Sequence, residues 1–456
     1  EAAVLTVDGV GEWATTTYGH GRAAQLEIFE EVEFPHSLGL LYSTLTSYLG
    51  FRVNDGEYKV MGLAPYGTPR YADRLRRVLL CQPGGQYRLD LSYFDFLRGR
   101  RMWSDKLAEL LEGPPRSPEA PLEPRHQDLA RSLQQVLEET LLEKVGYLRT
   151  RVDTPNLCMA GGVALNCVAN GRILREGPFE RLFVQPAAGD AGGCLGAAVL
   201  AQVKLSGERP AHGRLGHAYL GPRFTVEQVA EQIGSLGLAA LDFRGREADL
   251  LEATVDRLLA GQVVGWFHGA MEFGPRALGA RSLLADPRDP DMRERLNRLV
   301  KKREAFRPFA PSVLASEAAQ HFDLDHASEF MLETCAVRSP LSLPAITHVD
   351  GSARPQTVHP ERAPRYAALL AAFERRTGCP LLVNTSFNVQ GEPIVCSPLD
   401  ALTSMAESEI DCLVLEDFLI DRSLLGDTLL RLLRYRSAAL FGRGQSAISS
   451  TLYTFI

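Results

Sequence analysis

Two acidic residues in the first half of the chain lie beside glycines where strand-like runs end. Asp8 follows the apolar run Val4–Val7 and precedes Gly9, whereas Asp190 lies in a glycine-rich turn before an apolar helix expected over 194–203. A carboxylate at a strand end suits a hard or borderline metal ion, and two that converge could share one cation. The alternatives are a hairpin turn at Asp8 and stabilisation of the helix N-terminus by Asp190.

A glycine pair marks a second candidate site. Gly161 and Gly162 follow a buried strand predicted over Asn156–Ala160, and a helix is expected from about residue 163. Glycines at a strand-to-helix turn let a phosphate or a flat ring approach the backbone. Asn166 would lie in the first helical turn, where its amide could reach a ribose or phosphate. The alternative is ordinary tight packing of strand against helix.

The window 276–307 is locally basic, with eight arginines and two lysines against five acidic residues. Guanidinium groups bind phosphate or carboxylate in a bidentate fashion, and a lysine adds a point charge. Arg276 and Arg307 stand in apolar, turn-rich sequence, which favours a binding role. The alternative, a solvated helix face, fits the arginines that alternate with acidic residues: Arg293, Arg295 and Arg298.

Two polar segments complete the candidates. The segment Asn384–Asn388 starts at the end of a strand expected over Leu381–Asn384, and a polar turn spans His348–Gln356. Hydrogen-bonding side chains just past a buried strand are typical of a ligand site, although either segment could be a simple turn. Taken together, the residues indicate an α/β protein with two anion-binding regions, one per domain, and fit a nucleotide-dependent transferase.

The elements that must position these residues alternate between strands and helices, as in α/β folds. The 456 residues are enough for two or three domains, and we expect boundaries near residues 210 and 425 with a peripheral tail over 426–456. The composition, 45% apolar and 23% charged, excludes a disordered, collagenous or coiled-coil chain. No apolar run reaches the ~18 residues of a membrane span.

The net charge and the distribution of cysteines indicate which partners and which cellular compartment to expect. The net charge of −7 argues against a nucleic-acid partner for the protein as a whole. The eight cysteines are scattered without a C-x-x-C pair, which predicts mostly buried thiols in a reducing compartment and a cytoplasmic protein. The sequence leaves the oligomeric state open.

Eight stretches resemble, in order, the NodU/CmcH family of ATP-dependent O-carbamoyltransferases. They span nearly the whole chain: LTVDGVGEWATT (5–16), EYKVMGLAPYG (57–67), AGGVALNCVANGRI (160–173), GDAGGCLGAA (189–198), FGPRALGARSLLADPRD (273–289), RPFAPSV (307–313), HVDGSARPQTV (348–358) and NTSFNVQGEPIV (384–395). The resemblance implies part of an actin/sugar-kinase-like (ASKHA) ATPase-type domain over 1–209 and a YrdC-like α/β domain over 210–425.

The resemblance also implies an activity. The second domain would make a carbamoyl-adenylate from carbamoyl phosphate and ATP with Mg²⁺. The first would pass the carbamoyl group to a hydroxyl of a small molecule or sugar, beside a bound Fe²⁺ or similar ion, in the biosynthesis of a secondary metabolite or modified saccharide. The sequence does not identify this acceptor, since acceptor pockets depend on loop shape.

Residue roles follow only from matching positions in these motifs. The resemblance implies that Lys301, Arg307, Arg276 and Arg354 bind carbamoyl phosphate and the nucleotide phosphates. Asn384 and Ser386 would complete this binding pocket. It places adenine nucleotide against Gly161, Gly162 and Asn166 in the first domain, and makes metal ligands of Asp8 and Asp190.

The chain departs from the family pattern at its start. It begins at Glu1, without Met, directly in a strand-like run. The family's two metal-binding histidines lie in a motif upstream of that strand. We therefore expect an absent N-terminal segment, weak metal binding and poor transfer, with the adenylate half-reaction better preserved. Two other hypotheses are a tRNA threonylcarbamoylation-related enzyme and a nucleotide-binding, non-catalytic relic.

Overall fold

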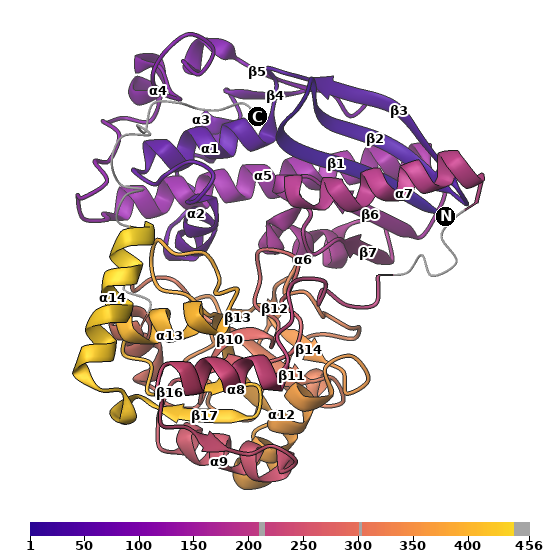
Figure 1. The fold of residues 1–456 in the computed structure, drawn as a ribbon. Coiled ribbons are helices and arrows are strands. Elements are labelled where there is room, and N and C mark those ends of the chain that lie inside the picture. The colour runs from indigo at the N-terminus through magenta and orange to yellow at the C-terminus, as the bar shows by residue number, and fades with distance from the viewer. Residues whose placement is uncertain (209–214, 301–302, 442–456) are drawn as a thin grey trace. The chain divides into compact units, whose positions relative to one another are not determined.

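The computed structural model describes residues 1–208, 215–300 and 303–441, which form two compact units. The first unit contains residues 1–208 together with Leu332–Thr334, and the second contains the other described residues. The boundary expected near residue 210 lies outside the described residues. Each unit combines a sheet with helices, so the fold is of the mixed α/β kind (Figure 1).

A five-stranded sheet forms the centre of the first unit. Its strands are, in spatial order, β3 (Gln25–Glu33), β2 (Ala14–Arg22), β1 (Ala2–Gly11), β6 (Asn156–Ala160) and β7 (Arg181–Val184). The first three pair in antiparallel fashion, whereas β1, β6 and β7 are parallel. Side chains alternate between buried and half-buried along Ala2–Val7, as expected when one face of a strand packs on the core.

The pairing of β1 with β2 is irregular between Val7 and Gly11. Asp8 therefore lies in an irregular stretch of the strand, and the hairpin turn comes later, at Glu12 and Trp13. The hairpin turn that we considered at Asp8 is wrong. An irregularity of this kind locally re-aims side chains, which is how a strand residue can face a site.

Helices cover the sheet of the first unit. Figure 1 shows α1 and α5 running side by side, and the two helices are in contact. The helices are α1 (Leu38–Tyr48), α2 (Glu57–Leu63), α3 (Ala72–Leu75), α4 (Asp105–Leu110), α5 (Pro124–Arg151), α6 (Cys167–Glu176) and α7 (Gly193–Ser206). Shorter elements are η1 (Ala64–Tyr66), η2 (Leu91–Tyr93), η3 (Gly162–Leu165), η4 (Asp190–Gly192) and the hairpin of β4 (Leu79–Cys81) and β5 (Tyr87–Leu89).

An eight-stranded mixed sheet forms the centre of the second unit. Its strands are, in spatial order, β14 (Gln356–Val358), β11 (Ala310–Leu314), β15 (Leu381–Ser386), β10 (Arg281–Ala285), β9 (Val264–Phe267), β16 (Cys412–Leu415), β17 (Phe418–Asp421) and β8 (Leu241–Asp242). The strands β9, β10, β11 and β16 are buried along their whole length, as expected for a sheet covered on both faces.

The helices of the second unit continue beyond the boundary that we expected at residue 425. They are α8 (Val226–Ser235), α9 (Glu247–Leu259), α10 (Met292–Arg295), α11 (Ala318–His321), α12 (Pro364–Thr377), α13 (Pro398–Glu407) and α14 (Asp427–Phe441), with η5 (Leu296–Val300), η6 (Arg422–Leu424) and a small hairpin of β12 (Cys335–Ala336) and β13 (Ser352–Ala353). Helix α14 contacts α13, where Arg436 Nη2 lies 3.0 Å from Asp400 Oδ1.

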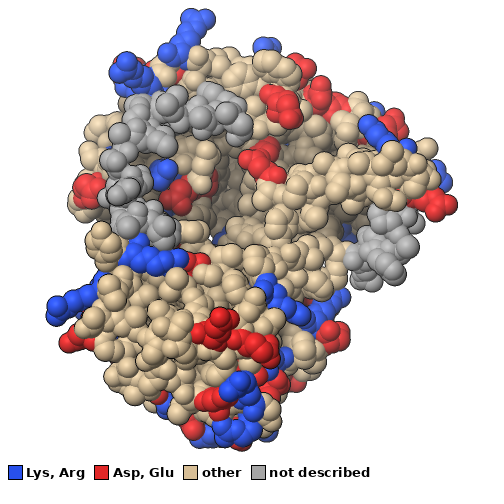
Figure 2. All heavy atoms as spheres, in the orientation of Figure 1, with Lys and Arg blue, Asp and Glu red and all other residues tan. Residues whose placement is uncertain are grey.

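Three properties of the described residues bear on the expectations from composition: the length and apolarity of the helices, the surface charge and the pairing of cysteines. None of the described helices is long and apolar enough to cross a membrane. On the face drawn in Figure 2, basic and acidic side chains are interspersed. All eight cysteines are unpaired; four are buried, namely Cys167, Cys335, Cys379 and Cys412, while Cys81, Cys194 and Cys396 are exposed.

Candidate functional sites in the two units

Four neighbouring strands of the second unit bring polar side chains to one end of the sheet. Strand β15 runs antiparallel to β10 and β11, and β14 runs parallel to β11. The end of β15, at Ser386, therefore lies beside the starts of the other three strands. Arg276, Arg307 and Arg354 precede those starts by five, three and two residues. Lys301, the remaining basic candidate, lies outside the described residues.

A buried amide network holds this end of the sheet together. Gln356 Oε1 accepts hydrogen bonds from Ser312 Oγ (2.6 Å) and Asn384 Nδ2 (2.9 Å), and Gln356 Nε2 donates to Leu278 O (2.7 Å). Asn384 Nδ2 also lies 3.2 Å from Ala277 O. These bonds tie the loop that follows Arg276 to strands β11, β14 and β15.

Asn384 lies inside the sheet rather than on the rim that the sequence suggested. It is 1% exposed, because β15 extends two residues further than the strand we expected. Its Oδ1 is buried and has no hydrogen-bond partner, so that atom is still able to accept a bond. Ser386, at the end of the same strand, is half-buried and donates to Asn388 Oδ1 at 2.8 Å.

Replacing Asn384 with alanine should lower the free energy of unfolding by about 1–3 kcal/mol, since the buried acceptors Ala277 O and Gln356 Oε1 each lose one donor. Urea denaturation of the purified chain measures this change. The matched control is Gln320→Ala, an exposed residue that bonds only Glu317 and should change stability by less than about 0.5 kcal/mol. Equal effects for the two variants would contradict a positioning role for Asn384.

Two buried charged residues support the loop between β9 and β10. Glu272 Oε1 accepts hydrogen bonds from the backbone N–H groups of Leu278 and Ala280, both at 2.7 Å, and burial raises the pKa of this carboxyl. Arg281 is fully buried with its guanidinium 3.5 Å from the ring centroid of Phe267, and burial lowers its pKa to about 10. Both residues hold the loop, although Glu272 Oε2 and Arg281 Nε are buried without a hydrogen-bond partner.

A histidine and a glutamate that the sequence analysis missed lie at the same end of the sheet. Strand β9 is antiparallel to β10 and parallel to β16, so His268 and Glu416, which follow β9 and β16, flank the same edge. His268 Nδ1 lies 2.7 Å from Glu416 Oε2, and Gly269 N donates to Glu416 Oε1 at 2.8 Å. Burial opposes ionisation of Glu416, but these contacts outweigh it and lower its pKa.

The first unit places Asp8 against the glycine turn. Asp8 Oδ1 accepts hydrogen bonds from Gly9 N at 2.7 Å and from Gly162 N at 3.1 Å. A Cβ on Gly162 would lie 3.1 Å from the same oxygen, so a glycine fits there best. Burial raises the pKa of Asp8, and the negative charge of Asp190 adds to that rise.

Asp190 is exposed and does not cap the following helix, since α7 has Gly192 as its N-cap without a side-chain bond. The negative charge of Asp190 contributes to the raised pKa of Asp8, so the two carboxylates lie within electrostatic range of each other. Among the described residues, however, no group of three or more His, Cys, Asp or Glu side chains could hold a metal ion. Asp8 and Asp190 alone do not make up the donor set of an iron site.

The raised pKa of Asp8 predicts a pH effect on stability. The folded chain binds a proton at Asp8 more readily than the unfolded chain does, so stability falls as the pH rises from the ordinary carboxyl pKa to the raised one. Asp8→Asn should therefore be more stable than the parent at pH 7 and should lose part of this pH dependence. Urea titrations between pH 4 and pH 7 without divalent cations measure it. Equal pH slopes for both chains would contradict the prediction.

Packing accounts for two residues that we expected to face a nucleotide. Gly161 has φ +94°, and a Cβ there would lie 2.2 Å from Val7 O, so this position requires a glycine. Asn166 Oδ1 caps α6 by accepting from Ala169 N at 3.0 Å, and its amide exchanges two 3.0 Å bonds with Gln134. The packing alternative is thus realised, and nucleotide binding by these residues stays a prediction.

Comparison with known proteins identifies the class. Residues 1–199 match the carbamoyltransferase N-terminus and residues 255–422 match the carbamoyltransferase C-terminus, so the chain belongs to the carbamoyltransferase family and is an enzyme of this class.

Three similar proteins support a narrower family assignment. The uncharacterized protein sll1178 of Synechocystis sp. is 49% identical over 93% of this chain and 73% of its own length. Nodulation protein NolO of Bradyrhizobium diazoefficiens is 40% identical over 92% of this chain and 75% of its own. The 3'-hydroxymethylcephem-O-carbamoyltransferase of Amycolatopsis lactamdurans is 37% identical over 52% and 44%. These relatives support the NodU/CmcH family.

Proposed function

We propose that the chain transfers a carbamoyl group from carbamoyl phosphate to a hydroxyl of a small molecule or sugar, with ATP consumed to form a carbamoyl-adenylate. The observation that supports this most directly is the shared sheet end of Arg276, Arg307, Arg354 and Ser386. Under this proposal the first unit corresponds to the ASKHA-type domain and the second to the YrdC-like domain.

The first half-reaction would take place at the sheet end of the second unit. Carbamoyl phosphate, water and ATP would yield carbamoyl-adenylate, pyrophosphate and phosphate, with a carbamate oxygen forming the new bond to the α-phosphorus. Carbamoyl phosphate and a triphosphate repel each other, and arginines offset that repulsion in the transition state. Arg354 has no hydrogen bond or ion pair among the described residues, so its guanidinium is available to an anion.

The second half-reaction would use the first unit. The acceptor hydroxyl attacks the carbamoyl carbon and AMP leaves. Mg²⁺ would accompany ATP, and we propose that Asp8 and Asp190 contribute to binding a divalent cation such as Fe²⁺ there. Because these two carboxylates do not complete such a site, no step of the reaction is assigned to that ion.

Carbamoyl-phosphate-dependent exchange of labelled pyrophosphate into ATP tests the first half-reaction without an acceptor. The proposal predicts exchange that requires both carbamoyl phosphate and Mg²⁺. Exchange that proceeds equally well without carbamoyl phosphate, or no exchange by a folded chain, would contradict it.

A further inference from the structure

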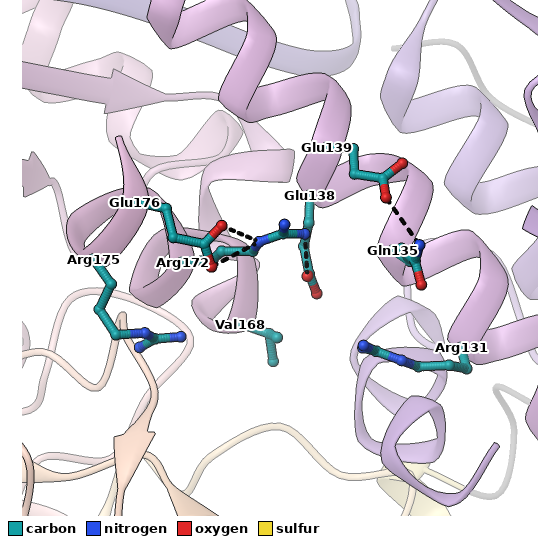
Figure 3. A pocket seen from close by; sticks show the side chains of 8 residues that line it. All are labelled: Arg131, Gln135, Glu138, Glu139, Val168, Arg172, Arg175 and Glu176. Atoms are coloured by element: carbon teal, nitrogen blue, oxygen red, sulfur yellow. Dashed lines mark hydrogen bonds and ion pairs between the residues drawn. The ribbon is translucent and has the colours of Figure 1, made fainter. Parts of the chain in front are cut away.

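A charged pocket of about 470 Å³ lies in the first unit, and none of the residues that line it belongs to the sites described above. Two helices line the pocket, and each contributes four residues at the same spacing: a first residue and those four, seven and eight positions later. Residues at this spacing share one face of a helix. Helix α5 supplies Arg131, Gln135, Glu138 and Glu139, and α6 supplies Val168, Arg172, Arg175 and Glu176 (Figure 3).

The carboxylates of this pocket already have partners. Glu176 and Glu138 both accept from Arg172, at 2.9 and 3.2 Å, and Glu138 also accepts from Gln134 at 3.0 Å. Glu139 is bonded by Arg76 at 2.7 Å and by Gln135 at 2.9 Å. Each of the three carboxylates therefore has an arginine partner within the protein, and a cationic ligand would have to displace these arginines.

Two guanidinium groups of the lining, in contrast, have N–H donors that make no hydrogen bond among the described residues. Arg131 makes no hydrogen bond or ion pair among the described residues, and Arg175 donates only to Thr334 O, at 2.8 Å. Figure 3 shows the two side chains entering from opposite sides and pointing toward each other, with Val168 between them. A group rich in acceptor oxygens and negative charge would satisfy both.

We propose that this pocket binds a small phosphorylated polyhydroxy compound, such as a sugar phosphate, through Arg131 and Arg175. Its volume exceeds what a free phosphate needs and suits a small organic ligand. Among the described residues that line the pocket, Val168 is the only apolar one, and none carries an aromatic ring on which a base could stack. The lining therefore favours a hydrophilic body over a nucleotide or a lipid.

A ligand here would contact a side chain, Glu138, that is linked by hydrogen bonds to the N-cap of α6. Glu138 accepts from Gln134 Nε2, and the same nitrogen lies 3.0 Å from Asn166 Oδ1. Gln134 is fully buried and Glu138 is 5% exposed. The pocket and the N-terminus of α6 thus share one hydrogen-bonded chain.

Isothermal titration calorimetry with glucose 6-phosphate, inorganic phosphate, glucose and AMP tests the proposal, in buffer without ATP or carbamoyl phosphate. We expect saturable binding of glucose 6-phosphate that is tighter than that of inorganic phosphate or glucose, whereas AMP bound at the proposed nucleotide site should keep its affinity in Arg131→Gln. Arg131→Gln and Arg175→Gln should each weaken it at least tenfold. The matched control is Arg77→Gln, which removes an exposed arginine of the same unit whose side chain has no partner among the described residues, and it should change the affinity less than twofold.

Absence of saturable glucose 6-phosphate binding, or equal losses in Arg131→Gln and Arg77→Gln, would overturn the proposal. Tighter binding of AMP than of glucose 6-phosphate, lost in Arg131→Gln, would overturn the assigned ligand class. Because no turnover is measured, the outcome is independent of the pyrophosphate exchange that tests the proposed function.

Discussion

Arg307→Ala should reduce carbamoyl-phosphate-dependent ATP–pyrophosphate exchange by about two to three orders of magnitude. Arg307 lies just before β11, at the sheet end where Ser386 and Arg276 also lie, and its side chain is 16% exposed. Arg307 also forms an ion pair with Glu304, whose Oε2 lies 3.5 Å from Arg307 Nη1. Removing one group that stabilises developing charge costs about 10²–10³ in rate.

The control for this variant is Arg375→Ala. Arg375 is 65% exposed near the end of α12, which leads into the start of β15 and therefore lies toward the opposite end of the sheet. Its loss should leave exchange within about twofold, since an exposed pair with Glu252 contributes little to stability. The assignment of the site fails if the two variants exchange at similar rates while their circular dichroism spectra match that of the parent.

Gly161→Ala should destabilise the first unit by more than about 3 kcal/mol. The backbone of Gly161 has a left-handed φ of +94°, which an alanine adopts only with strain. Its Cβ would also lie 2.2 Å from Val7 O and 2.6 Å from Val7 C, so β1 would have to move away from the turn after β6. Hydrogen exchange of the β1 amides, together with urea denaturation, measures the loss.

Gly193→Ala is the matched control, because a Cβ there meets nothing within 4 Å and the residue already has a helical φ of −56°. This change should be neutral or stabilising by about 0.5–1 kcal/mol. Protection of the β1 amides that is equal in both variants would contradict the packing role assigned to Gly161.

The elements near the site could be predicted from sequence where the pattern is local. The strand expected over Asn156–Ala160 matches β6 at both bounds, and the apolar helix expected over 194–203 lies within α7. In both, the apolar run is bounded by glycines, such as those after Ala160 and Gly207 at the C-cap of α7.

The contacts that build the sites could not be predicted, because they depend on pairing between distant strands. Arg295 was expected to pair with a neighbour in sequence, yet it bonds Asp411 at 2.7 Å. His268 and Glu416 each directly follow an apolar strand, a signal that becomes meaningful only once β9 and β16 are known to be parallel neighbours. Arg281 departs from the expectation in another way. It belongs to the basic window, for which we expected ligand-binding or solvated arginines, and yet it is fully buried.

The identity of the phosphorus products tests the central claim most directly. The folded chain is incubated with carbamoyl phosphate, Mg²⁺ and ATP labelled at the α-phosphorus, without an acceptor, and the products are separated. The account predicts pyrophosphate together with label in carbamoyl-adenylate or in the AMP that it releases, both dependent on carbamoyl phosphate and both lost in Arg307→Ala. Labelled ADP with orthophosphate as the only products would contradict it.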